Sequence, residues 1–216
     1  MRASNSWTVL AGELFAKSEI LTTLPKINSE LEKMSFHILP FAEPDAKIRL
    51  MYEDEAGFGR ISEPALCWAP SGVRPITYCH HIREYKHAYG AVDPINGDKF
   101  FLVLPYCNTE CMNIFLKELS AAYAKDYILL PLDRAVWHKS KTLEIPDNIR
   151  LFYLPPRTPE LNPIEQIWKE IRKRGFKNQI FQTLDKVVDR LCETINSLTD
   201  ECVKSITGRD WILSMF

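Results

Sequence analysis

Three carboxylates occupy positions at which α/β proteins often place their chemistry. Asp54 closes a stretch with strand periodicity, Asp133 directly follows the apolar run 127–132, and Glu165 lies in the first turn of an expected helix. Side chains at strand ends and helix starts point into crevices rather than into the core. Three converging acids repel one another unless a divalent cation neutralises them, and hard oxygen ligands suit Mg²⁺ or Mn²⁺. The pattern therefore indicates a metal centre formed by Asp54, Asp133 and Glu165.

Each acid also has a purely structural interpretation. Asp54 precedes Gly57 and could be a solvated turn residue, and Asp133 could cap a following helix. The tetrapeptide Asn-Pro-Ile-Glu at 162–165 fits an N-cap, a proline at the first helical position and a capping-box glutamate. Taken singly, each acid is explained by local structure. The metal interpretation depends on their combination with the surrounding motifs.

The elements expected to position these acids fall into two parts of the 216-residue chain. Residues 1–46 are predicted to form a helical arm, interrupted at Pro25, and a connector. Residues 47–216 are predicted to form one domain whose first half is mostly antiparallel sheet. Its expected strands are 47–53, 64–68, 75–81, 89–92 and 99–104. The last two form a hairpin because Asn96-Gly97 is a strong turn signal.

The second half of the domain alternates between helices and buried strands. Apolar runs at 127–132 and 149–154 are typical of strands buried on both faces. Helices are expected at 109–124, with Thr109 as its cap, near 135, at 163–174 and at 183–198. Strands followed by alternating helices and strands indicate an α/β fold with a mixed sheet covered by helices. Trp68 and Trp168 are expected in its core.

Three motifs around the acids carry a family resemblance. Residues 133–140 read Asp-Arg-Ala-Val-Trp-His-Lys-Ser, residues 159–168 read Pro-Glu-Leu-Asn-Pro-Ile-Glu-Gln-Ile-Trp, and residues 52–58 read Tyr-Glu-Asp-Glu-Ala-Gly-Phe. These segments resemble the catalytic motifs of the DDE-type transposases of the mariner-like superfamily and their bacterial insertion-sequence relatives. Segments 68–75 and 90–92 also match sequences typical of that family. The resemblance runs from about residue 48 to about residue 175.

The resemblance implies a ribonuclease-H-like fold: a mixed five-stranded sheet flanked by helices, with an extra hairpin and the N-terminal helical arm. It implies that Asp54, Asp133 and Glu165 are the catalytic, metal-binding triad for two Mg²⁺ or Mn²⁺ ions. Two such ions can stabilise both the attacking and the departing oxygen of a phosphodiester. The implied activity is cleavage of double-stranded DNA at transposon ends, followed by joining of the freed 3′-hydroxyl end to target DNA.

The sequence departs from the family pattern at several points. Arg134 stands where the family usually has Asn, and pairing of Arg134 with Asp133 would lower metal affinity. The interval of 32 positions from Asp133 to Glu165 is a few residues shorter than usual. About 46 residues before the first strand are too few for the family's helix-turn-helix modules. A separate or fused helix-turn-helix polypeptide and a homodimer are therefore candidate partners.

Other side chains are candidates for DNA contact. His138 matches a histidine of the family motif and could touch DNA or order the short helix. Arg157 and the cluster Lys169, Arg172, Lys173 and Arg174 could contact phosphates, although a solvated helix face explains the cluster equally well. The formal net charge of −1 provides no overall basic signature for nucleic acid.

Composition narrows the class and location of the protein. Hydrophobic residues make up 46% and charged residues 25%, as in ordinary globular domains. No signal peptide and no membrane-length apolar stretch is present, so we expect a bacterial, cytoplasmic, nucleoid-associated protein. Two alternatives to an active transposase stay open: a decayed or domesticated relic that keeps the fold, and a general ribonuclease-H-like nuclease acting on a hybrid or a Holliday junction.

Overall fold

The computed structural model describes Ser29 and residues 47–61, 64–76 and 81–213. The predicted helices of the arm and most of the expected strand 75–81 lie outside the described residues. Within the described part, no helix is both long and apolar enough to cross a bilayer.

The centre of the fold is a mixed sheet. Its first long strand runs over residues 48–59 and is interrupted only at Met51. Strands β2 (Tyr52–Gly59), β3 (Tyr85–Val92) and β4 (Lys99–Leu104) pair antiparallel in the order β2-β3-β4. Strands β1 (Ile48–Leu50), β5 (Tyr127–Leu132) and β6 (Ile149–Tyr153) pair parallel in the order β1-β5-β6. Only Met51 separates β1 from β2, and its N–H donates to the carbonyl of Leu129 at 2.9 Å. The expected five-stranded mixed sheet is therefore confirmed, in the order β4-β3-β2/β1-β5-β6.

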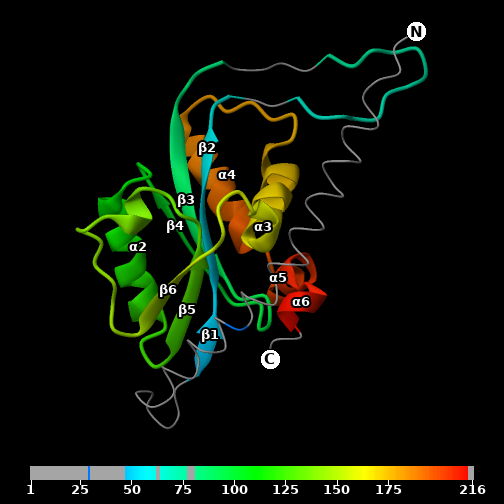
Figure 1. Cartoon of the computed structure of the whole chain (residues 1–216). Helices are drawn as coiled ribbons and strands as arrows, with labels where there is room; N and C mark the ends of the chain where they lie inside the picture. The colour runs from blue at the N-terminus through cyan, green and yellow to red at the C-terminus, as the bar shows by residue number, and fades with distance from the viewer. Residues whose placement is uncertain (1–28, 30–46, 62–63, 77–80, 214–216) are drawn as a thin grey trace.

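Helices cover both faces of this sheet (Figure 1). Helix α2 (Thr109–Ala122) covers one face, where Phe115 and Leu119 pack with Tyr89 and Ala91 of β3. Helices α3 (Ile164–Ile171) and α4 (Leu184–Asn196) cover the other face, where their apolar residues pack with Ala56, Phe58 and Ala88. The alternation of side chains along β2 and β3 supplies both cores. Helices α5 (Asp200–Thr207) and α6 (Asp210–Leu213) follow α4.

Two expected features of local structure are wrong. Residues 64–68 form no strand, and Leu66 and Trp68 are 93% and 103% exposed, so Trp68 is not a core residue. The segment contains Pro64 and pairs with no described strand, and the backbone N–H of Ala65 donates to Asn178 Oδ1 at 2.8 Å instead. Its β-propensity is therefore without effect. Helix α2 is capped by Asn108, whose Oδ1 accepts from the N–H of Cys111 at 2.9 Å, and Thr109 is already the first helical residue.

The hairpin between β3 and β4 depends on one glycine conformation. Asp93 Oδ1 accepts from the N–H groups of Ile95 and Asn96, and Gly97 has a φ of +79°. A Cβ added to Gly97 would lie 2.3 Å from the carbonyl oxygen of Asp200, so this turn needs glycine both for its backbone conformation and for its close contact.

Substitution of Gly97 by Ala should therefore destabilise the domain by at least about 2 kcal/mol. The matched control is Gly72→Ala, because Gly72 has a φ of +81° but no heavy atom within 4 Å of an added Cβ. The control should cost about 1–2 kcal/mol from backbone strain alone, and less than Gly97→Ala. Urea unfolding followed by circular dichroism measures both losses, and equal losses would contradict the importance of the Asp200 contact.

Candidate metal centre

The three predicted acids line one cleft of about 330 Å³, although they lie far apart in sequence. Asp54 is the third residue of β2, Asp133 directly follows β5, and Glu165 is the second residue of α3. Asp54 does not close its strand as expected, because β2 continues to Gly59. The parallel pairing of β1 with β5 brings Asp54 and Asp133 to the same region, and α3 carries Glu165 to it.

Asp54 is held in an unfavourable electrostatic environment. Burial, together with the negative charges of Glu165 and Glu55, raises the pKa of Asp54 to about 7. Two hydrogen bonds oppose this effect: Trp168 Nε1 donates to Asp54 Oδ2 at 2.9 Å, and the backbone N–H of Glu55 contributes the second. A cation in the cleft would remove the repulsion between Asp54 and Glu165.

Asp133 is exposed at the cleft and is oriented by two donors. Its Oδ1 accepts from the N–H of Ala135 at 2.8 Å and lies 3.0 Å from His138 Nδ1. The hydrogen bond with His138 lowers the pKa of Asp133, against the effect of burial, and the Ala135 N–H lowers it further. Both contacts use Oδ1. The structure does not bear out Asp133 as a helix cap, because the next helical turn, Trp137–Lys139, has Val136 at its N-cap and no side-chain cap. Asp133 is instead a carboxylate kept anionic in the same cleft as Asp54 and Glu165.

The capping-box interpretation of Glu165 is wrong. Helix α3 begins after Pro163 with no side-chain cap, and the side chain of Asn162 is engaged elsewhere. Asn162 Nδ2 donates to the carbonyl of Glu53 at 2.8 Å and so joins the start of α3 to β2. Glu165 has no capping role and lines the cleft.

The two arginines of the cleft have different environments. Arg134 Nε donates to the carbonyl of Leu154 at 3.0 Å, which joins the ends of β5 and β6. This contact engages Arg134 away from the Asp133 carboxylate. Arg157 also lines the cleft, is exposed, and has a φ of +61°. Such a conformation is costly for a residue other than glycine and is common at functional sites.

His138 is buried behind the cleft rather than exposed in it. It is 1% exposed, and its Nε2 lies 3.1 Å from Glu55 Oε1 and 3.7 Å from Glu53 Oε2. Burial would lower its pKa, but the hydrogen bonds with Asp133 and Glu55 outweigh that effect and raise the pKa of His138 to about 10. We did not expect Glu53 and Glu55 to take part. The sequence did contain one signal for them: Glu53 and Glu55 flank Asp54 along a strand, so their side chains must lie on the face of β2 opposite to Asp54.

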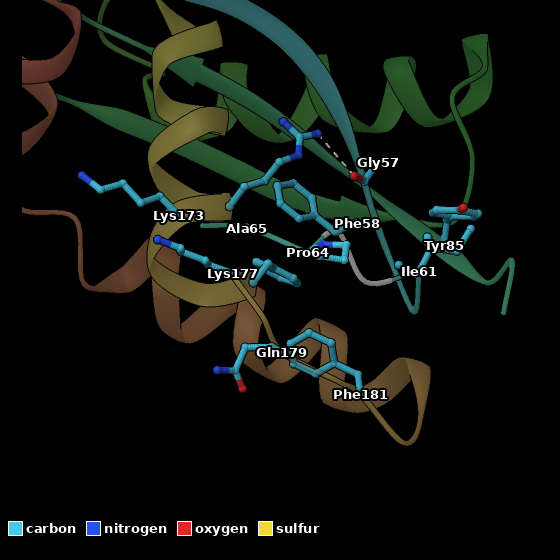
Figure 2. A pocket seen from close by; sticks show the side chains of 13 residues that line it. Gly57, Phe58, Ile61, Pro64, Ala65, Tyr85, Lys173, Lys177, Gln179 and Phe181 are labelled. Carbon is cyan, nitrogen blue, oxygen red and sulfur yellow. Dashed lines mark hydrogen bonds between the residues drawn. The ribbon is translucent and has the colours of Figure 1, made fainter. Parts of the chain in front are cut away.

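Part of the basic cluster, in the π-helical turn Arg172–Phe176 that follows α3, lies at a second cavity of about 440 Å³ (Figure 2). Arg172 and Lys173 line it, and Arg172 also lies over the ring of Phe58, 5.0 Å from its centroid. Arg174 and Lys173 both contact Glu170, at 2.8 and 3.5 Å. Lys169 is exposed. The structure therefore places Arg157 with the three acids, and gives Arg172, Lys173 and Arg174 packing or ion-pair partners of their own.

A mixed sheet with helices on both faces and an acidic cleft beside its central strand defines a ribonuclease-H-like domain. Comparison with known proteins agrees. The family described as DDE superfamily endonuclease matches residues 49–188. The chain belongs to this family.

The chain is also similar to individual proteins and solved structures. The protein is 42% identical over 130 residues to "Uncharacterized protein y4pE/y4sA" of Sinorhizobium fredii (strain NBRC 101917 / NGR234), an alignment that covers 59% of this chain and 96% of the relative. Among solved structures, a pre-cleavage Mos1 transpososome has a TM-score of 0.64 at 14% identity, over 90% of this chain and 60% of that one. A Mos1 mariner paired end complex with Mn has a TM-score of 0.55 at 16% identity, over 74% and 52%. The chain thus spans about 60% or less of the length of these transposase chains, and the likeness shows the shared fold.

Proposed function

We propose that this chain is the catalytic domain of a transposase that cleaves DNA strands at transposon ends and transfers the freed ends to target DNA. The observation that carries the proposal is the convergence of Asp54, Asp133 and Glu165 in one cleft. The family and the transposase fold support an endonuclease of this kind. The domain would comprise residues 47–216, preceded by the arm at 1–46, and would act in a bacterial cytoplasm.

The residues of the cleft fit a pair of Mg²⁺ or Mn²⁺ ions. Three carboxylates provide hard oxygen ligands, and a bound cation would offset the repulsion between Asp54 and Glu165 that, after burial, helps raise the pKa of Asp54. Asp54, Asp133 and Glu165 would hold the ions. Once bound, two such ions activate a water or 3′-hydroxyl nucleophile and stabilise the leaving oxygen. The family model and the Mn-containing relative are consistent with a divalent cation.

The surrounding residues would orient these ligands and the DNA. Trp168 fixes one oxygen of Asp54, and His138 with the Ala135 N–H fixes one oxygen of Asp133. Arg157 stands exposed at the same cleft and could bind a phosphate of the DNA backbone. Lys169 of α3, together with Arg172, Lys173 and Arg174 in the turn that follows it, would contribute further phosphate contacts. Retention of all three acids favours an active enzyme over a decayed copy.

Nicking of supercoiled plasmid tests this function. We expect relaxed and linear products with Mg²⁺ or Mn²⁺ and none with EDTA. A linear duplex carrying the ends of the source element should be cut at those ends, whereas an RNA–DNA hybrid should be a poor substrate. Preferential cutting of the hybrid would favour a general ribonuclease-H-like nuclease instead. Absence of any metal-dependent cutting, even with the end sequences present, would count against the proposal.

A homodimer is the assembly that we propose for DNA binding, with or without a helix-turn-helix polypeptide. The described part of the connection between β2 and β3 extends away from the sheet and helices (Figure 1). Leu66, Trp68, Val73 and Ile76 in it are all at least half exposed. Several exposed large apolar side chains in one projecting segment favour a protein interaction site.

The expected result is a dimer that depends on this connection. Light scattering during gel filtration should give twice the chain mass for the wild type and one chain mass for Leu66→Asp with Trp68→Asp. The variant Glu160→Gln, on an exposed residue elsewhere, serves as the control. A wild-type monomer at all concentrations, with and without DNA, would contradict the dimer.

A further inference from the structure

A second cluster of metal-ligand side chains lies on the face of β2 opposite to Asp54. Glu53, Glu55 and His138 each direct one ligand atom to a common point, and these atoms lie within 4.8 Å of one another. Glu53 is fully buried and His138 is 1% exposed. Neither carboxylate oxygen of Glu53 has a hydrogen-bond partner among the described residues. The nearest recorded charged group is His138, whose Nε2 is 3.7 Å away from Glu53 Oε2.

The buried Glu53 carboxylate lacks a partner for its oxygens. Removing a carboxylate from water without hydrogen bonds or a counter-ion is costly, and neither oxygen of Glu53 accepts a hydrogen bond among the described residues. A cation held between Glu53, Glu55 and His138 would supply that partner.

The distances match a small coordination sphere. Bonds of about 2.0–2.2 Å to a tetrahedral ion place its ligand atoms about 3.3–3.6 Å apart. His138 Nε2 lies 3.1 Å from Glu55 Oε1 and 3.7 Å from Glu53 Oε2, on either side of this range. The second nitrogen, Nδ1, lies 3.0 Å from Asp133 Oδ1. A carboxylate that accepts from the far nitrogen is the usual support of a metal-bound histidine.

We propose that Glu53, Glu55 and His138 Nε2 bind a transition-metal dication of the Zn²⁺ class, at a site separate from the acidic cleft. The nitrogen ligand selects against Mg²⁺, which prefers oxygen ligands and retains its waters. Trp137 Nε1, which donates to Glu55 Oε1 at 2.8 Å, orients a second ligand. The ion would fix the tautomer of His138, with Nδ1–H donated to Asp133. This proposal does not depend on the proposed DNA cleavage, because the three ligands of the site differ from the three acids of the cleft.

Zinc content after refolding tests the site directly. Because the cluster is buried, the chain is refolded with Zn²⁺ and then desalted, and zinc per chain is measured by mass spectrometry. The double variant Asp54→Asn/Glu165→Gln removes cleft ligands and leaves the cluster intact. We expect one Zn²⁺ per chain in this double variant, and at least about tenfold weaker binding when Glu53→Gln is added to it. Equal zinc with and without Glu53→Gln in this background, or no zinc in the double variant, would overturn the proposal.

X-ray absorption at the zinc edge of the refolded wild-type chain keeps the proposal testable even when Glu53→Gln fails to fold. We expect oxygen ligands and one imidazole, with no sulfur. A spectrum without imidazole would overturn the assignment, and so would one with sulfur, which would point to Cys107, whose Sγ lies 3.1 Å from His87 Nδ1.

Discussion

The substitution Asp54→Asn should reduce the rate of Mg²⁺-dependent plasmid nicking at least about 10³-fold. Two ions that stabilise the attacking and leaving oxygens contribute several kcal/mol, and each 1.4 kcal/mol corresponds to about a factor of ten in rate. Asp54 lines the cleft with the other two acids, and Glu165 is close enough for its negative charge to raise the pKa of Asp54. Asparagine has a side chain of the same size as aspartate, and its Oδ1 can still accept a hydrogen bond from Trp168 Nε1. The loss should therefore appear in activity with little change in the thermal unfolding midpoint.

Two further variants make this prediction specific to the cleft. Glu165→Gln should show a loss of the same order, because Glu165 lines the cleft with Asp54. Glu160→Gln is the matched control, since Glu160 is exposed in the single turn that precedes α3 and does not line the cleft. It should nick at the wild-type rate. An Asp54→Asn protein that keeps more than a tenth of wild-type activity would exclude Asp54 as a metal ligand.

The second large effect concerns stability. Trp168→Ala should lower the free energy of unfolding by about 3–5 kcal/mol, as deletion of a large buried aromatic side chain does. Trp168 is 1% exposed, and its ring centroid lies 5.6 Å from that of Phe101 and 6.2 Å from that of Phe58. Its Nε1 also donates to Asp54 Oδ2. The same side chain thus anchors α3 on the sheet and fixes a residue of the cleft.

Trp168→Phe separates these two roles. Phenylalanine keeps most of the apolar packing but has no N–H donor, so it should cost about 1–2 kcal/mol from the lost hydrogen bond and incomplete filling. Urea unfolding at constant pH measures both variants. A Trp168→Ala loss below about 1 kcal/mol would show that α3 is held in place by other contacts.

The sequence contained enough information to predict the sheet and the three acids of the cleft. The apolar run 127–132 and the Asn-Gly turn were strong local signals, and the structure has a strand and a hairpin there. Asp54, Asp133 and Glu165 were found by combining weak positional arguments with specific motifs. The structure shows that they share a cleft, and their roles as metal ligands stay a prediction.

The remaining errors have tertiary causes. The segment 64–68 has strand-like residues, but strand formation requires a pairing partner that local sequence does not reveal. The sequence around Asn162 is typical of a helix N-cap. The side-chain amide of Asn162 instead donates to the carbonyl of Glu53, 109 positions away. The cluster of Glu53, Glu55 and His138 was missed for the same reason, because His138 reaches β2 only in the folded chain.

Anomalous scattering from crystals of the wild-type protein soaked in Mn²⁺ tests the central claim most directly. We predict anomalous density in the cleft, in contact with carboxylate oxygens of Asp54, Asp133 and Glu165, and its loss in crystals of Asp54→Asn. Crystals in which these three side chains are well ordered and accessible, yet Mn²⁺ is absent from between them, would contradict the account.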